Sequence, residues 1–215
     1  MRCCKRNRRF SMGRTLLLAL GIFLTIACSL TGLVILPNWQ FQGLKPVIKR
    51  DGTQYPAPYF GDNKKGRAEY ISHGCIYCHT QQVRMKGYGA DIRRGWGTRR
   101  SVPRDYIYDF PHQLGTMRTG PDLANIGARQ PSRDWHALHL YDPRITSPGS
   151  VMPSFSYLFD EVEKGSITPS GAIKVPDGNS KHGNIVYIVP NERGEQLITY
   201  LKLLNQSFPL PEALQ

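Results

Sequence analysis

The sequence predicts a mainly α-helical domain with long loops, attached to a single N-terminal transmembrane helix. Three observations lead to this expectation: an uncharged run of 22 residues near the N-terminus, segments with helix-capping residues and apolar periodicity, and 21 Gly and 16 Pro among 215 residues. Because only one apolar run is long enough to cross a bilayer, a polytopic membrane protein is excluded. A content of 40% hydrophobic and 20% charged residues argues against wholesale disorder.

The apolar run is TLLLALGIFLTIACSLTGLVIL, residues 15–36, which is long enough for a membrane-spanning helix. Residues 1–14 form a basic leader with six Lys and Arg and no acid. The positive-inside rule therefore predicts a single pass through the bacterial inner membrane, with a cytoplasmic N-terminus and a periplasmic domain. A cleaved signal peptide or a lipoprotein site at Cys28 is the alternative, but the run continues past Cys28 and no A-x-A site follows.

The net charge of +12 does not indicate a nucleic-acid-binding protein. Part of the excess lies in the leader, the remaining basic residues are scattered, and no recognition module is present. We therefore expect the membrane, and no nucleic acid, as a partner.

The segment after the anchor divides into a tether and a domain. Residues 37–60 contain four prolines and little periodicity, which predicts an extended tether. The domain is expected over residues 61–215, and its first helix, over about 64–74, is capped by Asp62 or Asn63. Residues 86–118, rich in Gly, Arg and aromatic side chains, predict a long ordered loop.

Two more helices are expected in the second half of the domain. Ser132 is the predicted cap of a short helix through residues 135–139, and Asn191 is the predicted cap of a helix over about 192–205. Leu197, Leu201 and their neighbours form an apolar stripe on that last helix, which indicates core packing. Between these helices, residues 159–190 form a polar insertion with a predicted hairpin at 185–189.

The spacing of two cysteines indicates which cofactor the exported domain binds. Of five cysteines, only Cys75 and Cys78 lie in the predicted exported domain, and with His79 they form C-x-x-C-H, the attachment signature of c-type haem. Two thiols at this spacing can add to the two vinyl groups of one haem, and His79 then becomes the proximal iron ligand. A disulfide or thiol-redox pair, half of a zinc site and a chance match are the alternatives.

Two further residues complete the predicted site. Pro121, in a rigid Gly-Pro turn, can offer a carbonyl to the far nitrogen of His79. Met152, in the Pro-flanked loop before the terminal helix, is the expected sixth ligand, with Met117 or one of the histidines (His73, His112, His136, His139 and His182) as alternatives. For His136 and His139 we favour an ordinary place on a helix face.

Histidine and methionine ligation raises the reduction potential of a haem relative to two histidines. With both axial positions filled, we expect electron transfer and no catalytic residue that acts on a substrate.

Several segments together resemble a known family, the membrane-anchored mono-haem subunit of cbb₃-type cytochrome c oxidases (subunit II, the CcoO/FixO type). In order, these segments are GCIYCHTQ (74–81) with Arg84, YDFP (108–111), RTGPDL (118–123), DWHALHL (134–140), DPR (142–144) and Met152-Pro153. The resemblance covers roughly residues 10–158. Residues 159–190 and the leader with Cys3 and Cys4 depart from the family pattern.

The resemblance implies a class I cytochrome c fold with one covalent haem c, held by Cys75 and Cys78 with His79 and Met152 as axial ligands. It implies two partners: a haem-copper catalytic subunit that reduces oxygen, and a di-haem cytochrome c subunit or another cytochrome c as electron donor. The rival functions are a free-standing anchored cytochrome c carrier, the cytochrome subunit of a nitric oxide reductase, and a haem-based sensor. A sensor would need an output domain, and about 14 residues before the anchor leave no room for one there.

Overall fold

The fold was determined as a computed structural model, which describes residues 12–176 and 184–213. The chain divides into two compact units, residues 1–45 and 46–215. Most of the predicted basic leader, with Cys3 and Cys4, lies outside the described residues, as does His182.

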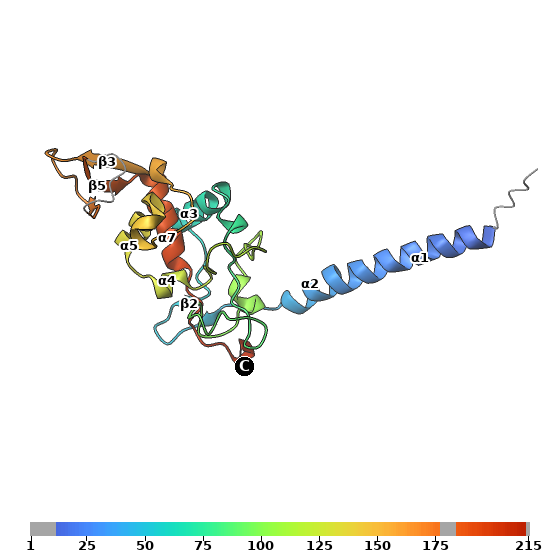
Figure 1. The fold of residues 1–215 in the computed structure, drawn as a ribbon. Coiled ribbons are helices and arrows are strands. Elements are labelled where there is room, and N and C mark those ends of the chain that lie inside the picture. The colour runs from blue at the N-terminus through green and yellow to red at the C-terminus, as the bar shows by residue number, and fades with distance from the viewer. Residues whose placement is uncertain (1–11, 177–183, 214–215) are drawn as a thin grey trace, which may run out of the picture. The chain divides into compact units, whose positions relative to one another are not determined.

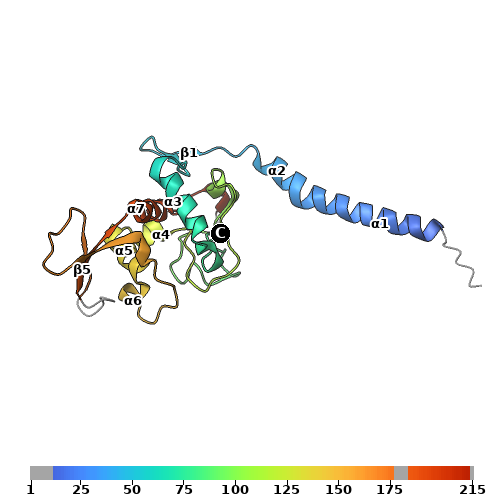
Figure 2. The same ribbon diagram turned by 90° about the horizontal axis from the view of Figure 1, so that it is seen from above.

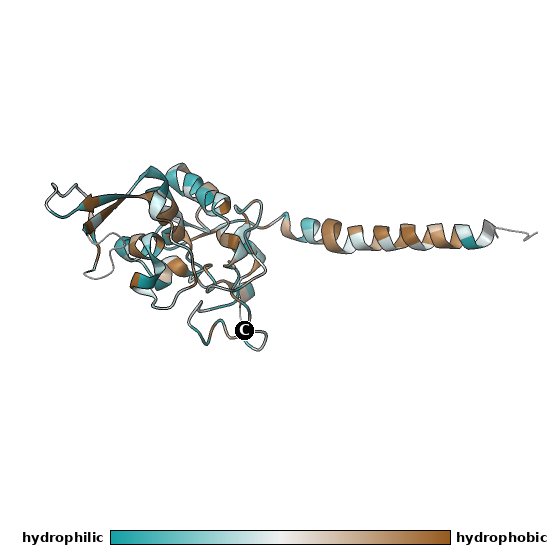
Figure 3. Ribbon diagram, turned by 45° about the horizontal axis from the view of Figure 1, so that its top comes forward, coloured by the Kyte–Doolittle hydropathy of each residue, from teal (hydrophilic) through white to brown (hydrophobic). Residues whose placement is uncertain are grey.

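The N-terminal unit is one helix. It consists of α1 (Met12–Leu30), a π-helical turn (Thr31–Ile35) and α2 (Leu36–Phe41). The stretch Gly13–Phe41 is long and apolar enough to cross a membrane, and Figure 3 shows the apolar residues along it. We expected this helix to end at Leu36. It continues because the π-helical turn, which ends at Ile35 in the turn before Pro37, accommodates a residue that has no N–H to donate.

The globular unit is built on two helices that pack against each other. These are α3 (Gly61–Ser72) and α7 (Glu192–Leu203), which lie side by side in Figures 1 and 2. Gly66 permits the close approach, since a Cβ at this position would stand 1.8 Å from the carbonyl oxygen of Gln196. The core surrounds this contact and includes Tyr70, Leu197 and Tyr200, all fully buried.

Shorter helices cover the rest of the core. They are α4 (Ile126–Arg129), α5 (Arg133–Tyr141) and α6 (Pro143–Thr146). Four 3₁₀ turns accompany them: Cys75–Tyr77, Pro103–Tyr106, Ser156–Leu158 and Pro211–Ala213. Helices are therefore the main regular elements, and one helix among the described residues is long and apolar enough to cross a membrane, as expected.

The predicted caps are right for two helices and wrong for one. Ser132 Oγ accepts from the N–H of Trp135 at the start of α5, and Asn191 Oδ1 accepts from that of Gly194 at the start of α7. In contrast, α3 begins at Gly61, so Asp62 lies inside its first turn and the capping position belongs to Phe60, whose backbone is extended.

The insertion 159–190 contains more strand than the predicted hairpin. Strand β5 (Ile185–Pro190) is the centre of an antiparallel sheet in the order β3-β5-β4, with β3 (Phe159–Glu163) and β4 (Ile173–Lys174) at its edges. Ile188 of β5 is fully buried and joins the main core.

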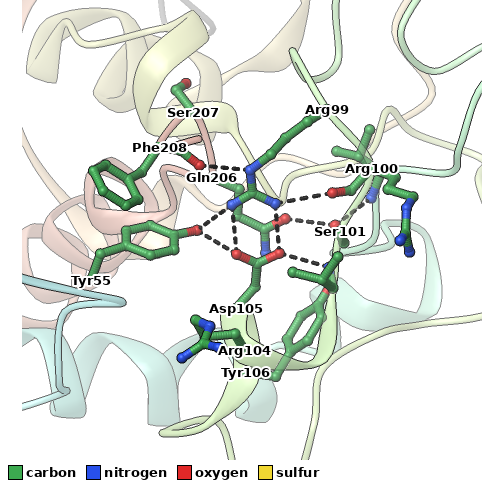
Figure 4. Close-up of polar contacts among 12 residues, drawn as sticks. Tyr55, Arg99, Arg100, Ser101, Arg104, Asp105, Tyr106, Gln206, Ser207 and Phe208 are labelled. Atoms are coloured by element: carbon green, nitrogen blue, oxygen red, sulfur yellow. Dashed lines mark hydrogen bonds and ion pairs between the residues drawn. The ribbon is translucent and has the colours of Figure 1, made fainter. Parts of the chain in front are cut away.

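Residues 46–60 belong to the globular unit, which differs from the expected tether. Strands β1 (Val47–Ile48) and β2 (Gln54–Tyr55) form a small antiparallel hairpin. Tyr55 is buried in a second cluster, where the Arg99 guanidinium donates to its hydroxyl at 2.9 Å and to both oxygens of Asp105 at 2.7 and 2.9 Å. Arg99 Nε also donates to the carbonyl of Phe208 (Figure 4), so the hairpin, the long loop and the C-terminal segment are joined.

Residues 86–118 contain no α-helix or regular strand, as predicted. Their local structure is an isolated bridge between Lys86 and Gly89 and the 3₁₀ turn at Pro103–Tyr106.

Candidate functional site

One cavity of about 570 Å³ brings together the residues that the sequence singled out. Its walls are mostly apolar and include Cys75, Cys78, His79, Pro121 and Met152. Pockets for small molecules and cofactors commonly enclose roughly 300–1,000 Å³ and combine apolar walls with a few polar groups. The cavity therefore has the size and lining of a cofactor site.

The two thiols follow directly after α3. Cys75 begins the 3₁₀ turn and is half-buried, Cys78 is exposed, and both are free. Burial raises the pKa of the Cys75 thiol to about 12. Reactive thiols of redox pairs have a lowered pKa, so this environment does not favour the thiol-redox alternative.

His79 is held in one orientation. Its Nδ1 lies 2.7 Å from the carbonyl oxygen of Pro121, which is the hydrogen bond expected from the Gly-Pro turn. A carbonyl can only accept, so Nδ1 carries the proton and Nε2 keeps its lone pair. Burial lowers the pKa of His79, which favours the neutral ring. Gly120 lies against this ring, since a Cβ there would stand 2.2 Å from Cε1 of His79.

The segments around His79 and Pro121 are tied together by backbone hydrogen bonds. The N–H of Gly120 donates to the carbonyl of Cys78 at 2.9 Å, and the N–H of Leu123 donates to that of Thr80 at 2.7 Å. Fully buried Asp122 strengthens the contact, because its Oδ2 accepts from the Thr80 hydroxyl at 2.6 Å and from the N–H of Gln82 at 2.7 Å. Sequence reasoning gave Thr80 and Asp122 no role, since their partners lie about 40 positions away.

Met152 comes from the loop between α6 and the 3₁₀ turn at Ser156–Leu158. It is half-buried, packs against the main core and lines the cavity. Its N–H donates to the Ser150 hydroxyl at 3.2 Å. Met117, the alternative methionine, is 59% exposed and is not among the residues that line the cavity.

Three of the candidate histidines, His73, His136 and His139, also line the cavity, and His112 does not. The Nε2 of His136 bonds to the carbonyl of Gln130 at 2.8 Å. The His139 ring stacks on Trp135, and its Nδ1 lies 2.5 Å from the hydroxyl of Thr146. Burial, followed by the nearby His79, lowers the pKa of His139 to about 4.

Arg129 is a cavity residue that sequence reasoning missed altogether. It lies at the end of α4, and its Nη2 donates to the carbonyl of Asp122 at 2.6 Å. No local pattern marks an arginine of this kind, because the cavity exists only in the folded chain.

The donor set fits a c-type haem. Two thiols, an imidazole with a free Nε2 and a thioether line one apolar cavity, which are the groups that attach and ligate such a haem. A zinc site gains no support, because no group of three or more His, Cys, Asp and Glu side chains suited to a metal ion occurs among residues 12–176 and 184–213.

Comparison with known proteins agrees with this geometry. The sequence profile of a family described as "Cytochrome C oxidase, mono-heme subunit/FixO" matches residues 11–175, which is most of the chain. No curated protein matches the chain.

Proposed function

Because the chain belongs to the mono-haem subunit family of cytochrome c oxidase, FixO, we propose that it relays electrons through one covalent haem c to a haem-copper catalytic subunit that reduces oxygen. Membership of this family implies a mono-haem subunit that works in electron transfer and associates with the catalytic subunit. The single observation that carries the proposal for this chain is the cavity shared by Cys75, Cys78, His79 and Met152.

In this proposal the globular unit is a class I cytochrome c domain. The thiols of Cys75 and Cys78 form the thioether bonds, His79 is the proximal ligand and Met152 the distal ligand. The haem supplies a one-electron couple. The chain's own residues attach it, orient its ligands and keep water from it.

Pro121 and Gly120 contact the His79 ring and set its orientation. The carbonyl of Pro121 fixes the His79 tautomer that leaves Nε2 available for iron, and Gly120 leaves room for the ring. The apolar walls of the cavity penalise the net charge of the ferric state, and together with a thioether ligand they favour a high reduction potential.

The helix Gly13–Phe41 serves as the membrane anchor in this account. Because residues 1–14 are basic, the positive-inside rule predicts that the N-terminus lies in the cytoplasm of a bacterium and the haem domain in the periplasm. Electrons then enter from a periplasmic donor, a di-haem cytochrome c subunit or another cytochrome c.

The loop 86–118 supports a subunit over a free-standing carrier. It presents large apolar side chains to solvent, among them Tyr88, 80% exposed, Phe110, 88% exposed, and Met117. A minimal carrier domain does not need such a segment, and a contact with a partner protein would cover these side chains.

Purification from native membranes in mild detergent tests the proposal. We expect the chain to co-purify with a large polytopic subunit, with haem b and copper at a fixed ratio to haem c. A chain that emerges alone, with one haem c and no copper, would support the anchored-carrier function. A partner that holds haem b and non-haem iron without copper would support the nitric oxide reductase function.

A further inference from the structure

Asp122 is a fully buried acid that stands next to the wall of the cavity without lining it. It follows Pro121 directly in the chain, and only its neighbours Pro121 and Leu123 are among the lining residues. A buried carboxylate is costly unless hydrogen-bond donors and a positive charge compensate it. The electron relay proposed above gives this group no part, so its position needs its own explanation.

The donors around Asp122 favour its negative form. Oδ2 accepts from the Thr80 hydroxyl at 2.6 Å and from the N–H of Gln82 at 2.7 Å. Oδ1 accepts from the N–H of Ala124 at 2.9 Å, and the Arg118 guanidinium lies 3.6 Å from Oδ2. Burial raises the pKa of Asp122, and these contacts oppose that effect. Both oxygens are therefore fixed by neighbouring groups.

The contact between Asp122 and Thr80 joins the two segments that hold the proximal ligand. Thr80 follows His79 directly, just as Asp122 follows Pro121. The His79 ring donates from Nδ1 to the carbonyl of Pro121 at 2.7 Å. This hydrogen bond and the one from Thr80 to Asp122 thus connect adjacent pairs of residues in the same two segments.

The backbone alone does not fix the acceptor of this ligand. The N–H of Gly120 donates to the carbonyl of Cys78, and the N–H of Leu123 donates to that of Thr80. Neither hydrogen bond uses the peptide group between Pro121 and Asp122, whose oxygen faces His79. The Asp122 side chain is bonded on the far side of this peptide group, so it limits how far the group can turn.

We propose that Asp122 is a positioning residue for the proximal ligand, and that its carboxylate holds the Pro121 carbonyl against His79. This inference rests on the proposed function, because it takes His79 to be an iron ligand. A firmly held acceptor makes an imidazole a more basic ligand. A more basic ligand stabilises ferric iron, so Asp122 lowers the reduction potential from outside the cavity.

The test compares Asp122→Asn with Asp109→Asn in the full chain, purified in mild detergent from its native membrane. Asp109 is a matched control, because it is buried, accepts from Arg67 at 2.7 Å and from the N–H of Gln113 at 2.9 Å, and does not line the cavity. Three quantities are measured: covalent haem per chain, the midpoint potential, and the solvent exchange rate of the His79 Nδ1 proton. NMR of the ferrous, ¹⁵N-histidine-labelled protein gives the exchange rate.

We expect Asp122→Asn to keep its covalent haem, to raise the potential and to speed this exchange about tenfold, as for the loss of roughly one hydrogen bond. The amide replaces one acceptor with a donor, so one of the surrounding donors loses its partner and the turn shifts. Asp109→Asn is expected to match the wild type in potential and exchange. A haem-loaded Asp122→Asn protein that is merely less stable, with potential and exchange unchanged, would overturn the inference.

A second pair of variants separates position from charge, since the loss of a negative charge also raises the potential. Thr80→Val keeps the charge of Asp122 and removes the hydroxyl that binds it, whereas Thr80→Ser keeps that hydroxyl. We expect Thr80→Val to raise the potential and to speed the exchange, by less than Asp122→Asn, and Thr80→Ser to restore most of both.

The Thr80 pair also decides the matter if Asp122→Asn does not accumulate. A Thr80→Val protein with unchanged exchange and a potential that does not rise would show that Asp122 does not position the ligand. A wild-type chain without covalent haem would instead refute the proposed function, so the two failures are distinguishable.

Discussion

At the scale of single residues, Gly120 leaves no room for a side chain beside His79. A Cβ there would overlap the His79 ring at 2.2 Å, so Gly120→Ala must displace the ring from Pro121 or shift the turn. We expect a loss of about 1–3 kcal/mol in stability and a reduced yield of covalent haem. Gly43→Ala is the matched control, because nothing lies within 4 Å of its Cβ position. Equal haem yields in the two variants would contradict the role given to Gly120.

Met152 is tested through the reduction potential. Met152→Ala is expected to keep the covalent haem, since Cys75 and Cys78 are unchanged, and to lower the midpoint potential because the thioether is lost. Met117→Ala, in the exposed loop, serves as the control and is expected to leave the potential unchanged. A Met152→Ala protein with the wild-type potential would show that Met152 is not the distal ligand.

The local part of the site was predictable, and the long-range part was not. C-x-x-C-H fixes three residues within five positions, and a Gly-Pro turn limits what Pro121 can contact. Thr80 and Asp122 meet only after folding, and Arg129 gains its meaning from a cavity that several elements enclose. Spacing along the chain carries no signal for such contacts.

At the scale of elements, a buried ion pair between Arg118 and Asp91 holds the long loop. Arg118 donates to both oxygens of Asp91, at 2.5 and 2.8 Å, and also to the carbonyl of Gln82. Its guanidinium lies 5.4 Å from the centre of the Trp96 ring. This pair joins the start of the loop to its end, and both residues also bond to the segment that follows the haem motif, Arg118 to Gln82 and Asp91 to Arg84.

Asp91→Asn tests this link and its pH dependence. Hydrogen bonds from Arg118 and from the N–H of Arg84 outweigh burial and lower the pKa of Asp91. A lowered pKa in the folded state gives stability that is present above the ordinary Asp value of about 4 and is lost as the pH falls through the folded value. We expect the free energy of unfolding of the variant to be about 3 kcal/mol lower than that of the wild type at neutral pH. Chemical denaturation at a series of pH values should show this difference shrinking in acid; a difference that does not change with pH would exclude the ion pair as its source.

Helix ends and strands differ in how much the sequence reveals. Ser132 and Asn191 cap their helices as expected, because each bonds to an N–H only three positions away. Strand β4 has two residues and β3 carries three acids, so neither shows the alternation by which strands are recognised. Their pairing with β5 is a contact between distant segments, which explains why only part of this sheet was predicted.

At the scale of the whole molecule, the cluster around Arg99 joins three distant parts of the globular unit. Four prolines predicted a tether over 37–60, but Tyr55 is buried and its hydroxyl bonds to Arg99 and Asp105. No feature of the sequence near Tyr55 indicates these two distant partners. Arg99→Met leaves Asp105 buried without its cation. We expect a loss of about 3–5 kcal/mol in the free energy of unfolding.

Thermal and denaturant unfolding of the Arg99→Met protein measure this loss. Lys49→Met is a control, because Lys49 lies over the rings of Tyr55 and Phe208 without entering the buried network. Limited proteolysis should also cut residues 46–60 faster in Arg99→Met than in the wild type. Unchanged stability together with unchanged proteolysis would show that the cluster does not fasten the hairpin.

The central claim is that this chain carries one haem c bound at Cys75 and Cys78, and peptide mass spectrometry of the chain from its native membrane tests it most directly. Cleavage after Arg67 and Arg84 releases a single peptide that contains both cysteines and His79. The account predicts this peptide with the mass of one added haem and with no free thiol. The same peptide without haem, whether reduced or as a disulfide, would contradict the account.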